Sequence, residues 1–124
     1  LTAGYGVDGI NGNSAFRTAD EDVTKTYAYQ AAEMLHADSR IVAYSGNGVL
    51  SRWIAPEQDT PYTKNILPEI FPYIQNEVPD LIVCNLGTND ASYVRQIPSR
   101  ERAFVEKYTD FIQQLKRKCF CFMV

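Results

Sequence analysis

The sequence holds few of the residues from which a disulfide framework, a metal site or a membrane span is built. It has three cysteines and one histidine in 124 residues. Three thiols make no disulfide framework, and Cys119 and Cys121, with Cys84 and His36 far away, lack the spacing of zinc ligands. No apolar run approaches the roughly 18 residues that a membrane helix needs. We therefore expect no metal and no membrane span, and we interpret the cysteines as small buried hydrophobic residues.

An excess of charge of one sign is also missing. Twelve basic and 15 acidic residues give a formal net charge of −3. Nucleic-acid-binding faces concentrate positive charge, and membrane-surface helices need a basic amphipathic stretch. We therefore expect neither a nucleic acid nor a membrane as partner. The remaining composition, 45% hydrophobic and 22% charged, is that of an ordinary globular domain.

The two ends differ from those of a typical complete protein. The chain opens at Leu1 without a methionine and stops at Val124 inside an apolar segment. No charged segment followed by an apolar one is visible near the start, so no signal peptide is recognised. We interpret residues 1–124 as one partial domain, and its compartment, secreted or cytoplasmic, stays open.

Helical and extended patterns alternate along the chain. Thr18 and Glu21 have the spacing of a capping box, which predicts a helix over about 20–36. Its apolar face is expected to comprise Ala28, Ala31, Ala32 and Leu35. A second helix is expected over about 62–77, although prolines interrupt it. The clearest helix is expected over 99–118, where apolar residues recur at helical spacing: Phe104, Tyr108, Phe111, Ile112 and Leu115.

Three short apolar runs predict strands between these helices, at 40–45, 80–86 and 119–124. Strands that alternate with helices predict an α/β fold with a parallel sheet and right-handed crossovers. Glycine-containing loops follow the first two strands, at 45–47 and 87–89. Both loops are expected at the carboxyl end of the sheet, where ligands bind in open α/β folds.

Two segments are candidates for a binding site on their residues alone. Gly4, Gly6 and Gly9 match the pattern GxGxxG, but no strand precedes them and residues 10–16 do not form a helical pattern. The pattern match alone makes a nucleotide-binding α/β module one hypothesis, and the missing strand and helix count against it. In the segment Asn85–Asp90, Gly87 permits a tight turn and Asn89 offers a neutral amide donor. On the residues alone, a turn in which Asn and Asp bond their own backbone is the favoured interpretation of this segment.

Three blocks together resemble the SGNH, or GDSL, hydrolase family: LTAGYG at 1–6, YSGNG at 44–48 and NLGTND at 85–90. The resemblance implies a three-layer α/β/α sandwich with a flavodoxin-like parallel sheet, here incomplete. It implies that the nucleophilic serine directly precedes Leu1. It also implies that the Gly46 backbone N–H and the Asn89 side chain are oxyanion-hole donors. The DxxH block, which supplies the catalytic histidine and its acid, does not occur in the chain.

The resemblance implies a serine esterase that works through an acyl-enzyme and needs no cofactor. The pattern of residues 18–22, with Tyr27 and Tyr29, is similar to the acetyl-xylan-esterase-like branch, which removes acetyl groups from carbohydrates. We expect a small-molecule or carbohydrate ester as substrate and an inactive chain in the form given. The alternative is a non-catalytic carbohydrate-binding derivative of the same fold.

Other candidate residues have a functional and a structural interpretation. Trp53 and Tyr62 follow the second block and either stack on a sugar or simply pack. His36 is expected at a helix end as a surface or capping residue. Ser45 lacks the GxSxG elbow and is expected to be structural. Asp90 is expected to order its loop through hydrogen bonds and not to act as an acid or base.

Overall fold

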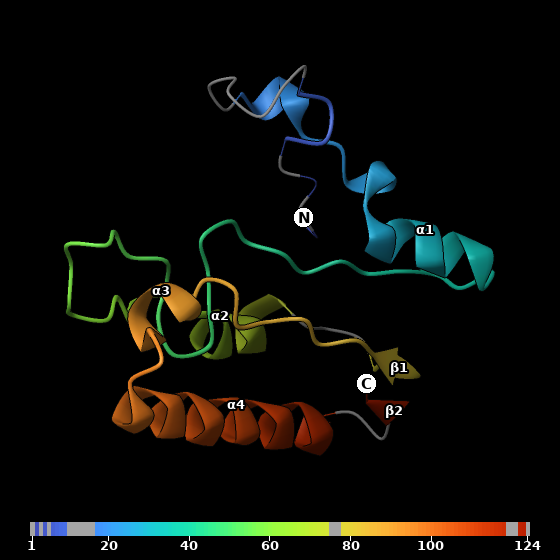
Figure 1. Ribbon diagram of the computed structural model, residues 1–124. Coiled ribbons are helices and arrows are strands. Elements are labelled where there is room, and N and C mark those ends of the chain that lie inside the picture. Colours follow the sequence, from blue (N-terminus) through green and yellow to red (C-terminus); the bar gives the residue numbers. More distant parts are fainter. Residues whose placement is uncertain are drawn as a thin grey trace. The chain divides into compact units, whose positions relative to one another are not determined.

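A computed structural model describes residues 2, 4, 6–9, 17–74, 78–118 and 122–123. The chain divides into two compact units, Leu1–Ser45 and Gly46–Val124. Figure 1 shows the elements of each unit. The predictions for Cys119 and Cys121 lie outside the described residues.

The first unit begins with two short 3-10 helices, η1 (Thr18–Asp20) and η2 (Val23–Lys25), followed by helix α1 (Tyr27–Met34). The helix predicted over 20–36 is therefore much shorter than expected. The predicted capping box at Thr18 is wrong, because the N-cap of η1 is Arg17, which makes no side-chain capping bond. The Asp22 carboxylate instead accepts the N–H of Thr24 at 2.9 Å, which turns the chain into η2.

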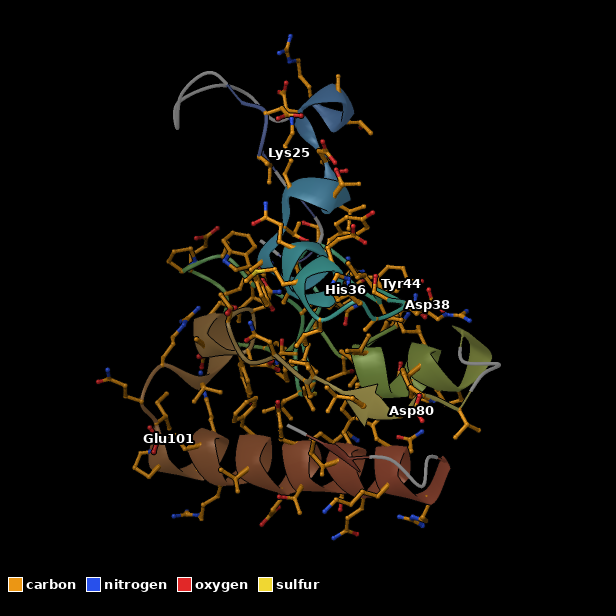
Figure 2. The ribbon with its side chains drawn as sticks, turned by 90° about the vertical axis from the view of Figure 1, so that its right-hand side faces the viewer. Lys25, His36, Asp38, Tyr44, Asp80 and Glu101 are labelled. Atoms are coloured by element: carbon orange, nitrogen blue, oxygen red, sulfur yellow. The ribbon has the colours of Figure 1, made fainter. Side chains whose placement is uncertain are left out.

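Helix α1 ends at a residue in the left-handed conformation. His36 has φ +52°, and its N–H donates to the Glu33 carbonyl at 3.1 Å. The next N–H, of Ala37, donates to the Ala32 carbonyl at 3.0 Å. These two bonds form the Schellman arrangement that closes many helices. The predicted place of His36 at a helix end is confirmed (Figure 2).

The strand predicted over 40–45 is wrong, because these residues have no regular secondary structure. A strand needs a partner for its backbone N–H and C=O groups. No strand is present among the described residues of this unit to supply one. The predicted apolar face of α1 is not covered within the unit either, since α1 has no buried residue and Leu35 is 71% exposed.

The second unit contains a parallel pair of strands connected through helices. Strand β1 (Leu81–Ile82) pairs in parallel with β2 (Phe122–Met123), with Leu81 opposite Phe122. Helices α3 (Ala91–Val94) and α4 (Pro98–Lys118) form the crossover between them (Figure 1). The parallel pairing expected for the segments 80–86 and 119–124 is confirmed, although each strand is only two residues long.

Helix α4 supplies much of the core of the second unit. Its predicted span of 99–118 is confirmed, and Phe111 and Leu115 are buried as the spacing predicted. The Phe111 ring meets that of Phe71, on helix α2 (Leu67–Ile74), edge to face at 5.7 Å. The buried hydrophobic residues of this unit are Val49, Ile54, Ile66, Leu67, Phe111 and Leu115.

Helix α2 starts five residues later than the predicted start at 62. The reason is that Tyr62 pairs with Arg52 in an antiparallel bridge, which keeps this part of the chain extended. Pro68 lies in the first turn of α2, where a backbone N–H has no helical partner to lose. Pro72 lies inside the helix and removes one backbone donor there.

Candidate functional site

Two loops of the second unit meet, although the strand expected before the first of them is absent. The first spans residues 46–51 and the second residues 87–90. The Asn89 side-chain amide donates to the Asn47 carbonyl at 2.6 Å. Gly46 and Gly87 have φ of +72° and +118°, values that favour glycine, so each loop turns sharply at its glycine.

Asp90 joins the same two loops from within the protein. Its side chain is only 1% exposed. Its carboxylate accepts the backbone N–H groups of Val49, Leu50 and Ser51 at 2.7 to 3.1 Å. Hydrogen bonds of this number and kind are what a buried carboxylate requires. The expectation that Asp90 orders a loop is confirmed, although it acts mainly on the loop at 46–51.

Gly48 is needed where this carboxylate approaches the backbone. A Cβ atom at position 48 would lie 2.6 and 2.7 Å from the two Asp90 oxygens and 2.1 Å from the Ser51 carbonyl oxygen. The Gly48 carbonyl also accepts the N–H of Leu67 at 3.0 Å, which fixes the start of α2 to this loop. Any side chain at position 48 would therefore displace the backbone against which Asp90 and α2 are held.

Asn47, like Asn89 and Asp90, helps to fix the loop at 46–51 through hydrogen bonds. The side chain is 9% exposed, and its amide donates to the Asn65 carbonyl at 2.8 Å. Its Oδ1 is buried and has no hydrogen-bond partner among the described residues. Asn47 thus holds the loop at two points: its carbonyl receives Asn89 and its side chain reaches Asn65.

An exposed pair of aromatic residues lies on the segment that follows, residues 52–62, here called the aromatic loop. The backbone N–H of Trp53 donates to the Gly46 carbonyl at 2.8 Å, so the residue is bonded directly to the first loop. The Arg52 N–H donates to the Tyr62 carbonyl at 2.8 Å, and the Arg52 guanidinium lies 5.2 Å from the centre of the Tyr62 ring. Trp53 and Tyr62 are 57% and 46% exposed, so both rings offer surface to solvent.

Ser92 and Arg95, which belong to no sequence motif, connect this aromatic loop to Asn89. The Ser92 hydroxyl accepts the Ile54 N–H at 2.9 Å and donates to the Asn89 carbonyl at 2.7 Å. Arg95 donates to the carbonyls of Ala55 and Gln58. Serine and arginine are too common in loops for their positions alone to have revealed these contacts.

No protein-family model matches the chain. The chain is 28% identical, over 123 residues, to the cellulase/esterase CelE of Acetivibrio thermocellus. Among solved structures, it is similar to a carbohydrate esterase family 2 enzyme, with a carbohydrate-binding domain, of Corynascus thermopiles (Myceliophthora fergusii). The TM-score is 0.81 and the identity 29%, over 98% of this chain. It is also similar to a family two carbohydrate esterase of Clostridium thermocellum in complex with cellohexaose. For that structure the TM-score is 0.72 and the sequence identity 26%, over 99% of this chain.

The chain is similar to family 2 carbohydrate esterases. These enzymes are SGNH hydrolases, so the resemblance stated from the sequence is confirmed. The chain spans 14% of the length of CelE and 40% of each of the two structures.

The segment that matches GxGxxG lies in the first unit. In the GxGxxG segment, the N–H groups of Val7 and Gly9 donate to the carbonyls of Gly4 and Gly6. The Asp8 carboxylate of the same segment pairs with Lys25. A phosphate-binding loop needs free N–H groups and no opposing carboxylate. The geometry of the described residues therefore disfavours the nucleotide hypothesis.

The Cys84 thiol is poorly suited to act as a nucleophile. Burial raises its pKa, which favours the protonated form. The Tyr108 hydroxyl donates to the Cys84 carbonyl at 3.2 Å. Burial also raises the pKa of Tyr108, to about 12. Both groups are therefore protonated at neutral pH and serve packing and hydrogen bonding.

Among the residues that the structure describes, no group of three or more His, Cys, Asp or Glu side chains is placed to hold a metal ion. Within the same residues, no helix has the length and apolar character to cross a membrane.

Proposed function

We propose that the full-length protein containing this chain is a carbohydrate esterase of SGNH type. It removes short acyl groups, chiefly acetyl, from a carbohydrate through an acyl-enzyme. The observation that carries this proposal is the contact between the two loops of the candidate site, in which the Asn89 amide reaches the backbone beside Gly46. The similarity to CelE and to the two family 2 esterases supports the reaction class.

Gly46 and Asn89 have the chemistry that an oxyanion hole requires. The tetrahedral intermediate of ester hydrolysis carries a negative oxygen, which preorganised neutral donors stabilise. The Gly46 N–H and the Asn89 amide are such donors. One hydrogen of the Asn89 amide binds the Asn47 carbonyl, which orients the group, and an amide carries a second hydrogen. In this proposal that second hydrogen donates to the oxyanion.

The remaining catalytic groups lie outside residues 1–124 in this proposal. The nucleophilic serine directly precedes Leu1, and the catalytic histidine and acid follow Val124. The complete domain is a three-layer α/β/α sandwich with a flavodoxin-like parallel sheet, to which β1 and β2 contribute two strands.

Trp53 and Tyr62 form the carbohydrate-binding surface in this proposal. Aromatic rings offer a large, rigid, apolar face, which suits the apolar face of a sugar ring. Their exposure and the attachment of Trp53 to Gly46 support this role. No cofactor is required, because a serine nucleophile, a histidine base and neutral donors complete the reaction.

The first test is labelling of the full-length gene product with a fluorophosphonate, followed by mass spectrometry to locate the label. We expect the label on a serine immediately before Leu1. A folded protein that takes no label and hydrolyses no ester would overturn the proposal. Binding of cello-oligosaccharides by that same inactive protein would then support the alternative, a carbohydrate-binding derivative of the fold.

The second test is Asn89→Ala in the same protein. Loss of one oxyanion donor is expected to lower kcat by about 10²–10³-fold. Hydrolysis of p-nitrophenyl acetate measures the effect. Gln113→Ala, which changes an exposed side chain on α4, is the matched control and should leave kcat unchanged. Equal rates for the wild type and Asn89→Ala would remove Asn89 from the oxyanion hole.

A further inference from the structure

The aromatic loop is connected to both proposed oxyanion donors, one on each side of Trp53. On one side, the Trp53 N–H itself donates to the Gly46 carbonyl at 2.8 Å. On the other side, the N–H of the next residue, Ile54, donates to the Ser92 hydroxyl at 2.9 Å. That hydroxyl donates in turn to the Asn89 carbonyl at 2.7 Å. A single side chain, Ser92, thus links the residue after Trp53 to the backbone of Asn89.

Arg95 fixes the next part of the same loop. Its guanidinium donates to the Ala55 carbonyl at 3.0 Å and to the Gln58 carbonyl at 2.6 Å. These two residues close a turn, in which the Gln58 N–H donates to the Ala55 carbonyl at 2.9 Å. The third bond of the guanidinium returns to the Ser92 carbonyl at 2.6 Å, which joins Arg95 to Ser92.

The backbone conformation at Arg95 points to the same role. Arg95 and Gln96 have φ of +47° and +59°, which is uncommon for two successive residues other than glycine. Such conformations persist only where the surrounding contacts determine them. Here the conformation ends α3 and coincides with the three bonds of the Arg95 guanidinium to the turn and to Ser92.

We propose that Ser92 and Arg95, together called the α3 clamp, are positioning residues that hold Trp53 at a set distance from Asn89. The clamp thereby determines the preference for acyl groups carried on a carbohydrate over simple esters. This inference rests on the proposed esterase function. A small ester needs only the oxyanion donors and the nucleophile. A carbohydrate ester also needs the aromatic surface in register with them.

The test compares two esters in the full-length gene product: an acetylated xylo-oligosaccharide and p-nitrophenyl acetate. For Ser92→Ala and Arg95→Met, we expect KM for the oligosaccharide to rise about tenfold. In Arg95→Met, where the lost guanidinium bonds only to the Ser92, Ala55 and Gln58 carbonyls, the kcat/KM for p-nitrophenyl acetate should stay within about twofold of the wild type, because misplacing a binding surface affects only the substrate that uses it. Thr109→Ala and Arg102→Met, on exposed positions of α4, are the matched controls and should change neither value.

A double-mutant cycle with Trp53→Ala gives a readout that a purely structural role would not change. If the clamp acts through Trp53, Arg95→Met adds little to the rise in KM caused by Trp53→Ala, since coupled residues are not additive. Additive effects would overturn the proposal. Parallel loss of activity on both esters in Arg95→Met would also overturn it. A wild type that hydrolyses neither ester would instead overturn the proposed function itself.

Discussion

Asp90 shows how one buried charge can organise two loops. Removing a carboxylate from water is costly unless hydrogen bonds replace the lost hydration. Three backbone N–H groups of residues 49–51 do so here. Because Asp90 directly follows Asn89, the same contacts fix the place of the proposed oxyanion donor relative to Gly46.

We expect Asp90→Asn to lower the free energy of unfolding by about 1–3 kcal/mol, for two reasons. The amide lacks the negative charge that strengthens the three bonds to Oδ1, and its NH₂ group cannot accept the Val49 N–H as Oδ2 does. Urea unfolding of the full-length protein measures the change. Asp110→Asn, at an exposed position of α4, is the control and should leave the unfolding free energy unchanged. An equal effect of the two substitutions would contradict the role of Asp90 in the loop.

Tyr108 should make stability depend on pH in the alkaline range. Burial raises its pKa from an ordinary value of 10.0 to about 12. The folded protein therefore holds the phenolic proton more tightly than the unfolded chain. This contribution to stability is fully present below pH 10 and is lost as the pH rises toward 12. Tyr108→Phe should reduce this alkaline loss, as measured by guanidinium unfolding at pH 8 and pH 11. Identical pH dependence in both proteins would refute the expectation.

At the scale of elements, helix α1 is capped by Thr26, a residue outside the predicted capping box. Thr26, not Thr18, accepts an N–H of the first turn, that of Tyr29. Its hydroxyl also donates to the Val23 carbonyl at 2.7 Å, and the residue is 3% exposed. The capping box expected from Thr18 and Glu21 does not form. The chain turns instead at Asp22, where the carboxylate accepts the Thr24 N–H.

Thr26→Ala should weaken α1 by about 1 kcal/mol, the usual cost of losing a capping side chain. Faster amide hydrogen exchange over residues 27–34 is the expected observation. Thr26→Ser keeps the hydroxyl and should restore protection. Unchanged exchange in Thr26→Ala would mean that the cap contributes nothing to this helix.

Long periodic elements and short ones differ in how well their sequences predict them. Helix α4 has five apolar residues at helical spacing, and its predicted span agrees with the structure. Helix α3, of four residues, was not predicted, because one turn is too short to show a period. The segment 40–45 has strand-forming residues, but a strand also needs a neighbour, which a local pattern cannot supply.

At the scale of the whole molecule, residues 1–124 alone should not hydrolyse p-nitrophenyl acetate above the buffer rate. The proposed serine, histidine and acid lie outside these residues, and the single histidine, His36, terminates α1. A spectrophotometric assay of the purified 124-residue chain measures this. Turnover that falls on Asn89→Ala substitution would contradict the expectation.

Local patterns in the sequence were enough to indicate which family this chain resembles. The blocks at 1–6, 44–48 and 85–90 identified the SGNH relationship, and the apolar spacing of residues 104–115 located α4. Both are local patterns, and local patterns can be read without knowledge of which residues meet. Gly46 and Asn89 could be selected as oxyanion donors by the same blocks, and this role stays a prediction.

The side chains that hold the candidate site together could be found only from the contacts of the folded chain. Asp90 reaches residues about 40 positions earlier in the chain, and Ser92 and Arg95 reach the aromatic loop across similar separations. The sequence around each of these residues contains nothing about its partner. Hydrogen bonds between distant segments form only when the fold has brought a donor and an acceptor within about 3 Å of each other, and that distance is a property of the packed chain.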